Sequence, residues 1–175
     1  MNIRFVTAFL NTHLQLMDGV SDEQFKKEYR ILSDFEEDAV GQWLKLAKAR
    51  GETTDSDDVL LRLLVELHKK VDQLTALVKN EERQLLALEV DTKICKIGFE
   101  HIKLEEELLQ EGKEYYCRIE MPVFPKREMP MFVKALDASV AQIILLHEAD
   151  QRDWNAYVTA RERIEIREMK AKNDY

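Results

Sequence analysis

The histidines that could bind a metal are spread widely along this chain of 175 residues. Histidine is a common ligand of zinc, and zinc sites usually show two or more ligands at short, regular spacings. The chain has 4 histidines, and none of them falls in an HxxxH or HExxH pattern: His13, His68, His101 and His147. No glycine-rich phosphate-binding loop occurs either. The sequence therefore predicts no metal site and no cofactor.

Three consecutive carboxylates, Glu105–Glu107, and two cysteines are the remaining candidates for catalysis. General acid–base catalysis needs a carboxylate that is removed from water, whereas a run of charges is usually a solvated surface. Cys95 and Cys117 have no CxxC spacing and lie in segments with a strand pattern, where a small buried thiol is the commoner role. We therefore predict no catalytic residues and a protein that is not an enzyme. A disulfide between the two cysteines is possible in principle, but free thiols in a reducing cytoplasm fit the sequence better.

The charge of the chain argues against nucleic acid as a partner. The net charge is -8, and binding to a phosphate backbone depends on a cationic face. Basic residues near the C-terminus are interleaved with glutamates, which is typical of a solvated helix. The apolar stretch Phe5–Leu10 is too short for a signal peptide, and no run approaches the length that crosses a membrane. We expect a cytoplasmic protein without nucleic-acid binding or membrane insertion.

The first third of the chain has a helical pattern. Apolar residues between Phe5 and Met17 recur at helical spacing and predict a first helix. Ser21 and Gln24 form a capping box for a second helix. Asp34 is expected to cap a third helix, which contains the tryptophan Trp43 in a packing role and ends at Gly51. An acidic connector, 51–58, then leads to the middle of the chain.

A ladder of apolar residues at three- and four-residue spacing dominates the middle of the chain. Its members share one side of a helix that is expected to start at Ser56 or Asp57 and to run to about residue 82. We call these residues the seam: Leu60, Leu64, Leu67, Val71, Leu74 and Val78. A seam of this kind needs a partner, and we predict a homo-oligomer built on this helix.

The apolar face is wider than a two-stranded coiled coil needs, because Leu61, Leu63 and Leu77 flank the seam. Two explanations are open. Either more than two helices meet at the seam, or the N-terminal helices of the same chain cover its flanks.

The second half of the chain changes to an alternating pattern, which predicts short strands. The alternating segments cover residues 86–90, 94–99, 115–121, 129–135 and 140–146. Pro122, Pro125 and Pro130 are expected at strand ends or edges. A helix from about Asp150 ends the chain. The predicted fold is α+β, with a small antiparallel β-barrel. Its parts are a helical region over 1–55, an oligomerisation helix over 56–82, and a barrel with a C-terminal helix over 83–175.

Residues 83–172 resemble the PilZ domain, the bacterial receptor module for cyclic diguanylate. The resemblance lies in the order of features: a strand ending at Leu88–Val90, a turn over Ile94–Phe99, an approach over Leu108–Lys113, a strand over Tyr115–Met121 that ends at Pro122, and a helix with Trp154. The resemblance implies a β-barrel and a regulatory role without catalysis.

The ligand motif of that family is degenerate in this chain. The family binds cyclic diguanylate through an RxxxR stretch and a D/N-x-S-x-x-G turn. Arg83 is the only arginine near the first stretch, and alignment on Gly98 places Cys95 at the serine position and Lys93 at the Asp/Asn position. A thiol is a poor hydrogen-bonding group, and lysine cannot accept a hydrogen bond. We therefore expect weak or no binding of cyclic di-GMP.

Divergent members of the family carry a long heptad helix that assembles them, and the resemblance implies a tetramer. Such members are implied to act in motility, type IV pili or virulence through contacts with a protein partner. The leading hypothesis is a PilZ-like scaffold of this type. Two alternatives remain: a receptor that binds cyclic di-GMP in an atypical pocket around Arg83 and Lys93, and a helical adaptor with a β insert.

Overall fold

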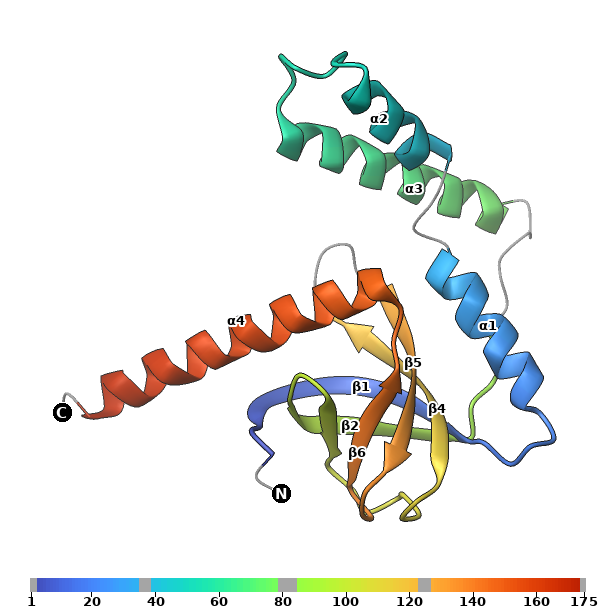
Figure 1. The fold of residues 1–175 in the computed structure, drawn as a ribbon, viewed down its shortest axis with the longest axis vertical. Coiled ribbons are helices and arrows are strands. Elements are labelled where there is room, and N and C mark those ends of the chain that lie inside the picture. Colours follow the sequence, from blue (N-terminus) through green and yellow to red (C-terminus); the bar gives the residue numbers. More distant parts are fainter. Residues whose placement is uncertain (1–2, 35–38, 79–84, 123–126, 174–175) are drawn as a thin grey trace. The chain divides into compact units, whose positions relative to one another are not determined.

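The computed structural model describes residues 3–34, 39–78, 85–122 and 127–173. The chain divides into two compact units. The first contains residues 1–33 and 87–175, and the second contains residues 34–86. The elements follow one another as β1-α1-α2-α3-β2-β3-β4-β5-β6-α4 (Figure 1).

The first unit is built on a closed antiparallel barrel, as the alternating pattern predicted. Its strands neighbour one another in the order β1-β2-β3-β6-β5-β4. Their bounds are Val6–Leu16 for β1, Val90–Ile97 for β2, His101–Leu104 for β3, Glu114–Met121 for β4, Arg127–Ala135 for β5 and Val140–Leu145 for β6. In this closed order each described strand has a neighbouring strand on both sides.

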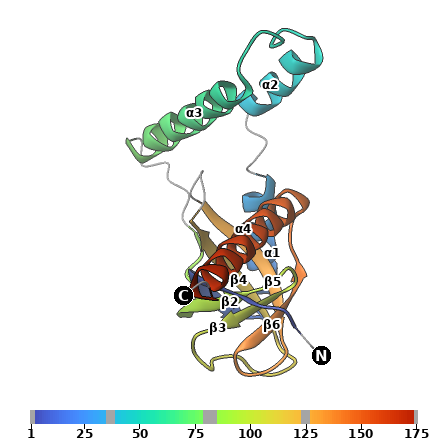
Figure 2. The ribbon, with the colours of Figure 1, turned by 90° about the vertical axis from the view of Figure 1, so that its left-hand side faces the viewer.

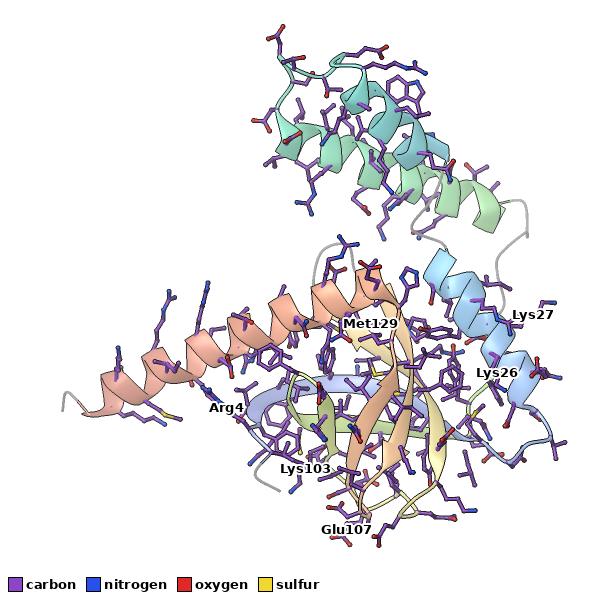
Figure 3. The ribbon with its side chains drawn as sticks, viewed as in Figure 1. Arg4, Lys26, Lys27, Lys103, Glu107 and Met129 are labelled. Carbon is purple, nitrogen blue, oxygen red and sulfur yellow. The ribbon has the colours of Figure 1, made fainter. Side chains whose placement is uncertain are left out.

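The barrel is filled by apolar side chains from every strand. Ile94, Ile119 and Met131 are among the fully buried residues, and Met129 is labelled among the barrel strands in Figure 3. Helix α4, Glu148–Asn173, contributes the buried Trp154, whose indole Nε1 donates to the carbonyl of Gly98 at 3.0 Å. This helix starts close to the predicted Asp150.

The prediction of a helix over Phe5–Met17 was wrong, because this segment contains strand β1. Side chains alternate along it, with Leu10 and Leu14 buried and Phe9 68% exposed. Residues four apart share a side in a strand as well as in a helix, since four is an even number. The Leu10–Leu14 spacing was therefore compatible with both structures. The pairing of β1 with β2 and β4 places the N-terminus in the barrel unit and not in a separate helical region.

Helix α1, Asp22–Asp34, begins next to the predicted capping box and packs on the barrel. The ring of Phe25 stacks on Tyr116 with centroids 5.5 Å apart, and Tyr29 meets Phe132 edge-on at 5.4 Å. Asp34 is the last residue of α1 and does not start the next helix. The α1 helix is thus part of the barrel unit.

Two helices, α2 (Ala39–Ala49) and α3 (Asp58–Val78), form the described part of the second unit. The two helices are in contact; α2 lies beside α3 in Figure 1 and next to one end of it in Figure 2. Gly51 ends the α2 region with a positive φ of 75°, as a C-terminal glycine does. The Asp57 carboxylate accepts from the amides of Val59 and Leu60 at 2.8 and 3.1 Å, which confirms Asp57 as the cap of α3.

Two details of the strand prediction need correction. Leu88 precedes β2 and does not end a strand, because β2 begins at Val90. Pro130 lies within β5, opposite Arg118 of β4. The register between β5 and β6 begins at Phe132, so the missing proline N–H falls outside that pairing. Pro125 lies outside the described residues. Among the described helices, none is long and apolar enough to cross a membrane.

Candidate functional site

The seam on α3 is an apolar surface that the described part of the second unit leaves uncovered. Its six side chains are between 51% and 85% exposed. Exposed apolar patches of this extent are rare on monomeric proteins and mark sites of association. The three- and four-residue spacing keeps them on one side of α3 over its full length.

Helix α2 contacts α3, and one side of α3 away from the seam is less exposed. Leu61 and Val65 are half-buried there, and Ala47 of α2 is buried. Leu63, on the other flank of the seam, is 49% exposed. Within the described part of the second unit, α2 therefore leaves the seam and its Leu63 flank exposed. The side chain of Leu77 lies outside the described residues.

Trp43 is 61% exposed on α2, together with the exposed Leu46. The prediction that Trp43 packs within the chain is wrong for this structure. An indole is large and mostly apolar, so its exposure adds to the uncovered surface of the helical unit.

The degenerate ligand motif lies on β2 and in the turn that follows. Lys93 is exposed, and its backbone carbonyl accepts from the amide of Glu105 at 2.8 Å. The thiol of Cys95 donates to the carbonyls of Lys103 and Leu104 at 3.5 and 3.4 Å. Arg83 lies outside the described residues. The thiol is therefore engaged with neighbouring backbone rather than turned toward a ligand.

Gly98, the one motif residue that the sequence retains, has a clear packing role. A Cβ atom at this position would lie 2.9 Å from the backbone oxygen of Arg4. The Gly98 amide donates to the carbonyl of His101 at 2.7 Å, and its own carbonyl accepts from Trp154. The close approach of three chain segments explains this glycine without any ligand.

The residues that the sequence offered as candidates for catalysis are either exposed on the surface or buried in the barrel. Glu105–Glu107 are exposed, as expected for a charge run, and Glu107 lies at a loop end of the barrel (Figure 3). Cys117 is buried, and burial raises the pKa of its thiol to about 12. A thiol with such a pKa is a poor nucleophile at neutral pH. The geometry around these residues provides no activated nucleophile or acid–base pair.

A buried polar network joins α1 to β4, and the sequence pattern did not predict it. The Glu28 carboxylate accepts from Tyr116 Oη at 2.9 Å and from Arg118 Nη1 at 2.6 Å. Burial, followed by the charge of Glu28, raises the pKa of Tyr116 far above its usual value. Tyr116 therefore stays a neutral donor. The network fixes the position of α1 on the barrel.

A second polar cluster lies on the outer face of β1, β4 and β5. His13 Nε2 is 3.7 Å from Glu120 Oε1 and 3.5 Å from Glu128 Oε1. His13 Nδ1 is 2.5 Å from Asp91 Oδ1. The three strands bring together residues that are far apart in the sequence.

The sequence matches no protein-family model and no curated protein. A solved structure similar to this chain is a pathogenic protein from Xanthomonas campestris, described as a new tetrameric PilZ domain that self-assembles via an unusual helical bundle. It is 14% identical, the match covers 97% of this chain and 93% of that chain, and the TM-score is 0.35.

Proposed function

We propose that this protein is a non-enzymatic, PilZ-like regulatory scaffold that self-associates through the seam of α3. The observation that carries the proposal is the exposure of all six seam side chains, between 51% and 85%, on a helix that is in contact with α2. A heptad seam is complementary to a second copy of itself, because each apolar side chain fits between four residues of the facing helix.

The energetic case rests on the apolar area that association would remove from water. Burying one leucine or valine side chain contributes about 1.5–3 kcal/mol, and each copy brings the same six residues. The exposed Leu63 widens the apolar face of α3 beyond a narrow two-stranded seam. This breadth favours a bundle of more than two helices, and we propose a tetramer.

An assembly of this kind would carry several barrels at once. Repeated display raises apparent affinity for a partner that also presents repeated sites. We propose that the partner is a protein, in signalling linked to motility, type IV pili or virulence. The engagement of Cys95 with backbone carbonyls and the packing of Gly98 support a barrel that does not bind cyclic di-GMP.

Charge substitution in the seam tests the proposal. In the double variant Leu67→Lys and Leu74→Lys, association would bury uncompensated charges, so light scattering should report a smaller mass. The matched control is Asp72→Lys with Gln73→Lys, which places two lysines at exposed positions of the same helix away from the seam. The control should keep the mass of the parent protein. Equal masses in all three proteins would contradict the proposal.

Calorimetric titration with cyclic di-GMP separates the scaffold from the receptor alternative. The scaffold proposal expects no binding at micromolar ligand. Saturable micromolar binding would favour the receptor with an atypical pocket.

A further inference from the structure

His13, Glu120 and Glu128 form a compact group of metal-ligating side chains on the barrel's outer face. One ligand atom from each residue lies within 4.8 Å of the other two. The three side chains are partly buried, between 24% and 34% exposed. They stand on strands, whose backbone pairing holds the side chains at fixed relative positions.

The two glutamates face each other directly. Glu120 and Glu128 are partners in the β4–β5 register, and like charges at such positions destabilise an antiparallel pair. Asn11 Nδ2 donates to Glu120 Oε2 at 3.1 Å. Arg118 Nε lies 3.6 Å from Glu128 Oε2, but the same guanidinium also pairs with Glu28. The negative charge of the two glutamates therefore exceeds the positive charge that Arg118 brings to them.

The histidine is oriented in the way that metal-bound histidines usually are. Asp91 pairs with Nδ1 of His13, so Nε2 is left to face the two glutamates. A carboxylate on the far ring nitrogen holds the ring in a fixed orientation, as it does for many metal-bound histidines. This contact comes from Asp91 of β2, separately from the two glutamates, and leaves Nε2 directed toward them.

We propose that His13, Glu120 and Glu128 bind a divalent transition-metal ion of the zinc class. Zinc binds histidine nitrogen and carboxylate oxygen at about 2.0–2.2 Å, and tetrahedral ligands at that distance are about 3.4 Å apart. The 3.5 and 3.7 Å separations match this value. A mixed nitrogen and oxygen set favours zinc over magnesium or calcium, which prefer oxygen alone.

A bound ion would neutralise the facing glutamates and tie β1 to β4 and β5. Three protein ligands leave a further position for water or another ligand. The site lies on the barrel and uses no residue of the seam. The metal site could therefore fail its test while the scaffold proposal stands, and the scaffold proposal could fail while the metal site stands.

Calorimetric titration of the chelator-treated full chain with zinc chloride tests the site. We expect one zinc ion per chain, and about tenfold or greater loss of affinity in His13→Gln and in Glu120→Gln. Glu120→Gln keeps an acceptor for Asn11, so it should fold normally. Magnesium chloride should bind much more weakly than zinc.

Matched controls separate this site from general surface binding. His68→Gln removes an exposed histidine that lies 3.2 Å from the carboxylate of Asp72, and Glu106→Gln removes an exposed carboxylate. Both controls should bind zinc as the parent chain does. Zinc should also raise the thermal midpoint of the parent chain but not of Glu120→Gln. Equal zinc affinity in the parent and both site variants, or no binding at millimolar zinc, would overturn the proposal.

Discussion

Arg161 on α4 donates through Nε to the backbone carbonyl of Thr7 on β1 at 3.0 Å. One turn further along α4, Glu165 accepts from the amide of the same residue at 2.8 Å. β1 pairs with β4 only from Thr12 onward, so this earlier part of β1 lies beyond the reach of β4. Two side chains of α4 thus bind backbone groups that a neighbouring strand would otherwise bind. Arg4, which lies near α4 (Figure 3), adds an ion pair to Glu162 at 3.3 Å.

The Glu165 contact predicts a pH-dependent contribution to stability. The backbone hydrogen bond from Thr7 lowers the pKa of Glu165 below its usual value of 4.5. A carboxyl with a lowered folded-state pKa stabilises the fold above its unfolded value, and the contribution is lost as the pH falls through the folded value. The gap in thermal midpoint between the parent chain and Glu165→Gln should therefore narrow between about pH 7 and about pH 3.

The exposed Glu168, on the same helix, supplies the control for this measurement. Glu168→Gln should track the parent chain across the whole range. A midpoint gap for Glu165→Gln that does not change with pH would contradict the assigned role.

The buried pair between Glu28 and Arg118 predicts a large loss of stability when one partner is removed. Glu28→Ala removes the 2.6 Å partner of the buried Arg118 guanidinium, which keeps its longer contact to Glu128, and it also removes the acceptor of Tyr116. Removing one member of a buried pair costs about 3–5 kcal/mol, and the Glu128 contact places our expectation at about 3 kcal/mol. Urea unfolding measures this change in the free energy of unfolding.

The exposed Glu23, in the first turn of the same helix, is the matched position. Glu23→Ala should change the free energy of unfolding by less than about 0.5 kcal/mol. Equal losses in the free energy of unfolding for Glu28→Ala and Glu23→Ala would show that the network does not hold α1 on the barrel.

The contacts of Gly98 predict that even an added methyl group is costly. In Gly98→Ala the new Cβ would meet the Arg4 carbonyl oxygen at 2.9 Å, and that oxygen belongs to backbone. Overpacking of this kind costs about 1–3 kcal/mol, which thermal unfolding should show as a lower midpoint. Gly112→Asn is the comparison, because its Cβ meets nothing within 4 Å and asparagine tolerates a positive φ. A larger loss at Gly112 than at Gly98 would argue against the packing role.

The barrel was predictable from the sequence where alternation was unambiguous. Apolar residues occupy every second position of Tyr115–Met121 and of Met129–Ala135, and both segments lie within observed strands. The first strand was missed because the Leu10–Leu14 spacing fits a helix equally well. Its membership in the barrel depends on pairing with residues more than seventy positions away, which a local pattern does not contain.

The two polar clusters were not predictable for a related reason. Glu28 and Arg118 become neighbours only after α1 docks on β4. His13 meets Glu120 and Glu128 only through the registers of three strands. A set of residues can be recognised in the sequence when all of them belong to one helix or strand, as the seam residues belong to α3. A site assembled across strands has no such local signal.

The central claim is self-association through the seam, and the mass of the unsubstituted chain in solution tests it most directly. Light scattering on the eluting peak, repeated over a wide range of loading concentrations, gives that mass. We predict a stable multiple of the 20.6 kDa chain. A mass of 20.6 kDa at every concentration would contradict the account.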